Sequence, residues 1–135
     1  MVGNEDPRIE AALAALNGSA EDWEHFLSVH PDASIVLAGE DLSDADLAGR
    51  NLSGIDFTGA DFFQSRLSSA NLKHARLADA DLSQADLSRS GLYKASLNSA
   101  AMMAANLEGA DLTLSLIHIS EPTRQLMSSR MPSSA

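Results

Sequence analysis

ANLKHARLADADLSQADL, residues 70–87, decides the fold of this chain, because an apolar residue returns in it at every fifth position. The same period runs without a gap from residue 40 to residue 112. A small residue stands two positions before most of the apolar centres, and Asp or Asn usually stands directly before them. The fifteen consecutive centres are Leu42, Leu47, Leu52, Phe57, Phe62, Leu67, Leu72, Leu77, Leu82, Leu87, Leu92, Leu97, Met102, Leu107 and Leu112.

A period of five residues fits neither regular element. In an α-helix, which turns about 100° per residue, the centres would scatter around the whole circumference. In a flat strand, where side chains alternate between two faces, every second centre would lie on the wrong face. The period therefore predicts a chain that turns a corner once per pentad and points the centre, and the residue two before it, into a shared core.

This pattern resembles the pentapeptide repeat family over residues 37–112. Fifteen in-register copies of one five-residue pattern make the resemblance specific, and self-similarity at a short period is typical of a solenoid. The resemblance implies an all-β solenoid, namely a right-handed quadrilateral β-helix with about four pentads per coil. Side chains twenty residues apart should then stack in columns. Leu42, Phe62, Leu82 and Met102 would form the first column, and Leu52, Leu72, Leu92 and Leu112 the third.

The pattern weakens at its start. Glu40 and Arg50 occupy positions that should point inward, and Ile55 is larger than the usual Ala. An unpaired charge is costly to bury. We therefore expect a distorted first coil in which Arg50 turns out to solvent or meets an acid such as Glu40.

Residues 1–33 have a different pattern and are expected to form a helical N-terminal cap. Pro7 suits a first helical turn, and Asn17-Gly18 would stop that helix. Ser19, with Asp22 three residues later, can cap a second helix that ends near His30. An open solenoid end exposes strand edges and the apolar side chains of the last coil. The helical pair should therefore cover the first coil, with Trp23 in the core of this cap.

The sequence thus divides into a cap (1–33), a pentapeptide-repeat β-helix (34–112) and a tail (113–135). The tail contains SLIHISEPTRQ and SRMPSSA, which resemble translated read-through of a sequencing adapter. We expect this tail to be artefactual or disordered, and the natural protein to continue differently after Leu112. Ile117 keeps the five-residue register and would add one more side to the coil.

Composition and charge favour a cytoplasmic module. The chain has no Cys, no charged start followed by an apolar run of the kind expected for a signal peptide, and no apolar run long enough to span a bilayer. Neither disulfides nor a membrane location is therefore expected. The net charge is -10, with eight acids and one base in residues 1–40. This charge disfavours direct nucleic-acid binding.

No catalytic, metal or cofactor site is expected. The four His residues, at positions 25, 30, 74 and 118, share no metal-ligand spacing with one another. No Gly-flanked nucleophile or phosphate-binding glycine run occurs, and a filled rod leaves no pocket for a substrate. The sequence predicts a non-catalytic scaffold that binds proteins, with no cofactor.

Two surfaces are candidates for partner binding. Asp41, Asp61 and Asp81 would form an acidic column, and family members that mimic DNA protect type II topoisomerases such as gyrase, which is the alternative function. The simpler interpretation is that each Asp bonds backbone amides in its own turn. The second surface is a basic and aromatic island of Lys73, His74, Tyr93 and Lys94. It could dock an acidic partner, and the simpler interpretation is that Tyr93 only lies over an aliphatic neighbour. The resemblance also implies a homodimer through the C-terminal end of the solenoid.

Overall fold

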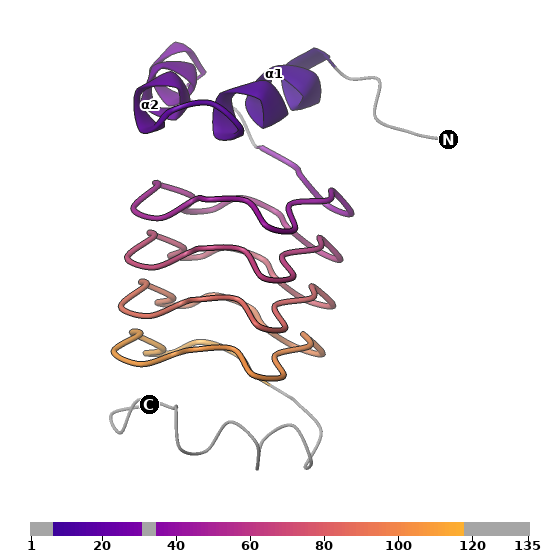
Figure 1. Cartoon of the computed structure of the whole chain (residues 1–135), viewed down its shortest axis with the longest axis vertical. Coiled ribbons are helices and arrows are strands. Elements are labelled where there is room, and N and C mark those ends of the chain that lie inside the picture. Colours follow the sequence, from indigo (N-terminus) through magenta and orange to yellow (C-terminus); the bar gives the residue numbers. More distant parts are fainter. Residues whose placement is uncertain (1–6, 31–34, 118–135) are drawn as a thin grey trace.

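The computed structural model describes residues 7–30 and 35–117, as a pair of helices on a stack of coils (Figure 1). Helix α1 spans Pro7–Leu16 and helix α2 spans Ala20–Val29. The coils of the described part contain no strand longer than one residue, and they are joined instead by thirteen isolated parallel bridges. The architecture is therefore a stack of short extended segments separated by corners.

Every bridge joins residues twenty positions apart, such as Asp41 with Asp61 and Asn51 with Asn71. Hydrogen bonds run in both directions between neighbouring coils. The Leu42 amide donates to the Asp61 carbonyl at 2.7 Å, and the Asp61 amide donates to the Glu40 carbonyl at 2.9 Å. The expected twenty-residue column spacing is confirmed, so four pentads make one coil.

A corner follows each centre. The second residue after every centre has a positive φ, from 57° at Arg89 to 75° at Gly39. The amide that follows this residue donates back to the centre's carbonyl, as from Ala60 to Phe57 at 2.9 Å. Because each pentad contains one such four-residue turn, the chain changes direction once every five residues.

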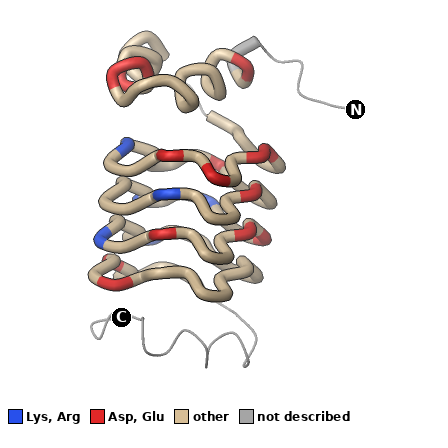
Figure 2. Tube along the Cα trace, viewed as in Figure 1, with Lys and Arg blue, Asp and Glu red and all other residues tan. Residues whose placement is uncertain are grey.

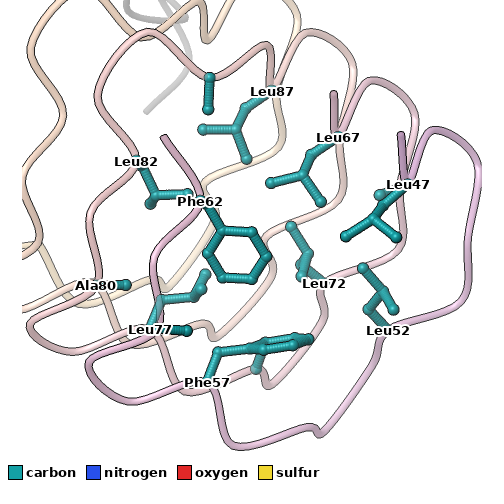
Figure 3. Close-up of a cluster of buried hydrophobic side chains, with 14 of the residues drawn as sticks. Leu47, Leu52, Phe57, Phe62, Leu67, Leu72, Leu77, Ala80, Leu82 and Leu87 are labelled. Carbon is teal, nitrogen blue, oxygen red and sulfur yellow. The ribbon is translucent and has the colours of Figure 1, made fainter. Parts of the chain in front are cut away.

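The centres fill the interior of the stack, where labelled side chains such as Leu47, Leu72 and Leu87 lie together (Figure 3). All fifteen are buried, the most exposed being Leu112 at 6%. Phe57 and Phe62 meet edge to face, with ring centroids 5.0 Å apart. At about 1.5–3 kcal/mol for each fully buried Leu or Phe, these side chains hold the coils together alongside the hydrogen bonds between coils.

The coil pattern extends beyond the fifteen centres on both sides. Leu37 is fully buried, and Ile117 is half-buried against the core. The Leu97 amide donates to the Leu116 carbonyl at 2.7 Å, so residues 113–117 add another side to the last coil. The division at residue 112 stays a prediction, and the expectations for the rest of the tail lie outside the described residues.

The two helices begin and end through local signals. Ser19 caps α2 as expected: its hydroxyl accepts from the Asp22 amide at 3.1 Å, and the Asp22 carboxylate accepts from the Ser19 amide at 3.0 Å. Such reciprocal bonds satisfy two amides that lack partners within the helix. In the part of the chain that is described, neither helix has the length and apolar character needed to cross a bilayer.

Trp23 and Arg50 fasten the helices to the first coil. Trp23 is fully buried, and its Nε1 donates to the Asn51 carbonyl at 2.7 Å. In the coil below, the equivalent carbonyl of Asn71 accepts from the Leu52 amide. The indole thus supplies the hydrogen bond that a preceding coil would supply, and the expectation that Trp23 lies in the core is confirmed.

The expectation for Arg50 was wrong. Its side chain neither turns out to solvent nor pairs with Glu40, since it is 7% exposed and donates to the carbonyls of Leu16 at 3.1 Å and Gly18 at 2.9 Å. These carbonyls lie at the C-terminal end of α1, where the last carbonyl groups lack helical partners and a positive charge is favourable. The carbonyls at the helix terminus therefore offset the cost of burying the Arg50 charge, and no carboxylate partner is needed.

Candidate functional site

The acidic column lies on the first face, which we define as the pentads centred on Leu42, Phe62, Leu82 and Met102. Bridges place Asp41, Asp61 and Asp81 one above another. Each Oδ1 accepts from the amide two residues later, at 3.0, 2.9 and 3.0 Å respectively. These carboxylates satisfy the turns that follow them, so their first role is structural.

The same turn bond recurs on other faces. Where the residue two positions after an aspartate also donates a hydrogen bond from its hydroxyl, the aspartate pKa is lowered. The Ser43 hydroxyl donates to Asp41 at 2.6 Å, and the Ser88 hydroxyl donates to Asp86 at 2.7 Å. The pKa values of Asp41 and Asp86 lie below the ordinary 3.8, chiefly because of these hydroxyl bonds. Hydrogen bonds to the ionised form favour it.

Charges of both signs alternate on the second face, which comprises the pentads centred on Leu47, Leu67, Leu87 and Leu107. Arg66 lies 3.9 Å from the Asp46 carboxylate, and its charge also helps to lower the pKa of Asp86. On the fourth face, which carries the centres Leu37, Phe57, Leu77 and Leu97, Arg76 does the same for Asp56. Neither face therefore presents a uniform anionic stripe. Down the front of the coil stack in Figure 2, acidic and basic positions alternate.

The basic and aromatic residues meet on the third face, which comprises the pentads centred on Leu52, Leu72, Leu92 and Leu112. The His74 amide donates to the Tyr93 carbonyl at 2.8 Å, and the two rings meet edge to face with centroids 5.9 Å apart. Lys94 Nζ lies 5.6 Å from the centre of the Tyr93 ring. The Asn71–Gly91 bridge sets Lys73 directly above Tyr93 in the same column.

Residues 7–30 and 35–117 contain no cluster of metal-binding side chains, because no three His, Asp or Glu residues there are placed so that they could hold one ion. His25 and His30 lie on or beside α2, whereas His74 lies at a corner of the third face. The expectation for His118 lies outside the described residues.

The roles of Arg50 and Trp23 in joining the helices to the coils were not foreseen. One signal for Arg50 was present in the sequence, because a charge at an inward position requires a buried partner. Its partners are backbone carbonyls some thirty residues away, and these carry no side-chain signature.

Comparison with known proteins agrees with this architecture. The family model "Pentapeptide repeats" matches eight copies, over residues 41–77, 65–102 and 80–115. These matches together span residues 41–115, more than half of the 135-residue chain. The comparison with curated proteins found no match.

Several solved structures are similar. For alr5209, a pentapeptide repeat protein from Nostoc PCC 7120, identity is 30%, the TM-score is 0.54, and the alignment covers 72% of this chain and 78% of that one. HetL, a pentapeptide repeat protein of the same cyanobacterium involved in heterocyst differentiation regulation, is 32% identical with a TM-score of 0.47. That alignment covers 59% of this chain but only 38% of HetL.

QnrB1, a plasmid-mediated fluoroquinolone resistance protein, is more distant, at 14% identity and a TM-score of 0.36, over 72% of this chain and 97% of QnrB1. A likeness at that level does not bear on function. The family match covers the residues whose five-residue pattern fills the core and contains the corners. The chain is a member of the pentapeptide repeat family.

Proposed function

We propose that this protein is a non-catalytic, rigid scaffold that binds other proteins through the outer faces of a right-handed, quadrilateral β-helix. The observation that carries the proposal is the filled interior: every centre from Leu42 to Leu112 is buried, and most of the residues two positions before them are buried as well. With side chains occupying the core, the outward residues are the ones available to partners. We place the protein in the cytoplasm.

A crosslinking experiment tests this proposal. A photoreactive amino acid would replace one outward residue on each face, at Ser43, Ser68, Ser53 and Ala78 in turn. A scaffold with a defined binding face should crosslink to a discrete protein from one face and not from the opposite one. Absence of any crosslinked protein from all four faces would overturn the proposal.

The alternative is a DNA mimic that protects or inhibits a type II topoisomerase. The observation in its favour is the stacked aspartate column Asp41, Asp61 and Asp81. The alternating charges of the second and fourth faces argue against it, because a duplex presents negative charge along its whole length. We expect gyrase supercoiling to be unchanged by micromolar purified protein, and a dose-dependent inhibition or protection would favour the mimic instead.

Dimerisation through the far end of the coil stack stays a prediction. A homodimer would cover the apolar side chains of the last coil around Leu107 and Leu112. Light scattering that finds only monomer across a wide concentration range would contradict it.

A further inference from the structure

We propose that the third face binds an extended acidic segment of a partner protein, through the cluster of Lys73, His74, Tyr93 and Lys94. This inference rests on the proposed scaffold function and names the face and the chemistry of the partner. It follows from the distribution of charge between the four faces, from two lysines that form no ion pair with the described residues, and from the spacing of the cluster.

Acidic residues avoid the third face. Between residues 36 and 115 the first face holds four acids, the second three and the fourth three. The third face holds only Asp111, in the lowest pentad, and its three upper pentads, NLSGI (51–55), NLKHA (71–75) and GLYKA (91–95), contain none. In a chain of net charge -10, these pentads form a local surface that does not repel an anion.

The two lysines of the cluster are the only lysines in the sequence. The only ion pair found within the described residues joins Arg66 to Asp46, so neither Lys73 nor Lys94 pairs with a carboxylate of residues 7–30 or 35–117. Both lysines and His74 are exposed, while Tyr93 is half-buried. The lysine charges are therefore available to a partner, beside an aromatic surface.

The cluster forms a two-by-two array. Lys73 stacks over Tyr93 in one column, and His74 stacks over Lys94 in the next. With roughly 4.8 Å between coils and roughly 3.8 Å between successive Cα atoms, the lysine Cα atoms lie on a diagonal of about 6 Å. Side chains on the same face of an extended segment repeat at about 6.6 Å. Carboxylates at alternate positions of such a segment can thus meet both lysines.

A polypeptide fits this surface better than a nucleic acid does. The acid-free area covers only three pentads, with Asp111 in the pentad below it. Above the coil stack, helix α2 carries Glu21 and Asp22 in its first turn (Figure 2). A nucleic-acid strand would carry its phosphates past these acids, whereas a short segment with two or three carboxylates need not reach them. Rim charges of this kind chiefly affect association rate, salt dependence and specificity.

The test uses the full chain and a fluorescent peptide of alternating Glu and Thr. We expect weak, saturable binding that declines as salt rises, because these charges are exposed and screened. The ring resonances of Tyr93, the only tyrosine, should shift with the same concentration dependence. The double variant Lys73→Gln/Lys94→Gln should weaken binding roughly fivefold or more.

The matched control is Arg66→Gln/Arg89→Gln, which removes the same net charge from exposed sites on the second face. It should leave peptide binding nearly unchanged, and circular dichroism would confirm that both variants fold. Equal weakening by both variants, or no binding to the unaltered chain, would overturn the assignment. So would salt-sensitive self-association through the lysines, because the occupant would then be the acidic cap of a second copy. A protein crosslinked from another face would preserve the scaffold function while this surface fails.

Discussion

The corner residue of each pentad, two positions after the centre, adopts a backbone conformation that favours glycine. Of the sixteen corners from residue 39 to residue 114, only five hold Gly, and the other eleven hold side chains at φ between 57° and 62°. A left-handed conformation costs a residue with a Cβ roughly 1–2 kcal/mol. The hydrogen bonds between coils and the packing of the core must outweigh this cost at the corners that lack Gly. The five-residue period is therefore visible in the apolar centres of the sequence and not in the residues at the corners.

Gly54 offers a clean measurement of that cost. Its φ is +73°, and a Cβ built there would meet no atom within 4 Å, so Gly54→Ala changes conformational energy alone. We expect this substitution to lower the free energy of unfolding by about 1 kcal/mol in urea denaturation. Gly91→Ala is the control, because Gly91 has equal space and no positive φ, and it should be neutral or slightly stabilising. Equal effects at the two sites would contradict this explanation.

Ser65 is an inward residue at a position where most pentads have Ala. Its Oγ is buried and has no hydrogen-bond partner among the described residues, whereas the Ser90 hydroxyl donates to the Leu87 carbonyl at 2.7 Å. A buried hydroxyl without a partner costs about 1–3 kcal/mol. Ser65→Ala should therefore raise the free energy of unfolding by about 1 kcal/mol, and Ser90→Ala should not. Calorimetric melting of the two variants distinguishes them, and stabilisation by both would count against the hydroxyl argument.

Asp86 links the turns to pH. The hydrogen bond from the Ser88 hydroxyl is the largest cause that lowers the Asp86 pKa below 3.8 in the folded state. A carboxyl with a depressed folded pKa contributes stability above its unfolded pKa, and that contribution is lost as pH falls from about 3.8 through the folded value. Ser88→Ala should raise the Asp86 pKa in a carbon-detected NMR titration, and Ser88→Thr should preserve it. If the Asp86 pKa were unchanged in Ser88→Ala, its lowering would come from the backbone hydrogen bond of Ser88 and from the arginine charges.

Among the elements, the attachment of the helical cap depends on Arg50. Replacing it with Met keeps an apolar stem and removes both donors, leaving the Leu16 and Gly18 carbonyls without that partner. We expect Arg50→Met to lower the free energy of unfolding by about 2–4 kcal/mol. Hydrogen bonds from charged donors contribute about 1.5–3 kcal/mol each, and the contributions of these two bonds are not fully additive.

The measurement for Arg50→Met is urea unfolding followed by the fluorescence of Trp23, the only tryptophan, which is fully buried in the cap. Arg66→Met removes an exposed arginine with a single distant ion pair and should cost less than about 1 kcal/mol. If both substitutions had the same small effect, the helix-terminus bonds would contribute little to cap docking.

The elements were predictable to different degrees. The Ser19–Asp22 capping box and the centres of the coils follow from residues within five positions of one another, and both were expected correctly. Docking of the cap was expected only in outline, because its hydrogen bonds join Trp23 to Asn51 and Arg50 to Leu16 and Gly18 across 28 to 34 residues. No sequence period links those positions.

For the whole molecule, we expect the net charge to oppose folding. The net charge is -10, and the one ion pair in the described part of the chain is exposed, with its atoms 3.9 Å apart. Salt should therefore screen more repulsion than attraction. We expect the melting temperature to rise by a few degrees between about 0.01 and about 0.5 M NaCl, where the Debye length falls from roughly 30 Å to less than 10 Å.

Sodium and potassium chloride should act alike in that melting series, because screening depends on ionic strength. A melting temperature that falls with salt would mean that favourable charge pairs, such as those of the second and fourth faces, outweigh the net repulsion.

The sequence by itself determined which side chains lie inside the coils and that each pentad contains one corner, because both are local consequences of a five-residue repeat. It also placed Lys73, His74, Tyr93 and Lys94 near one another once four pentads were assigned to a coil. The tertiary structure alone decided what meets the first coil: the indole of Trp23 replaces a missing amide, and the end of α1 accepts the charge of Arg50. Those partners are backbone carbonyls, which every residue has, so only their positions in space could select them.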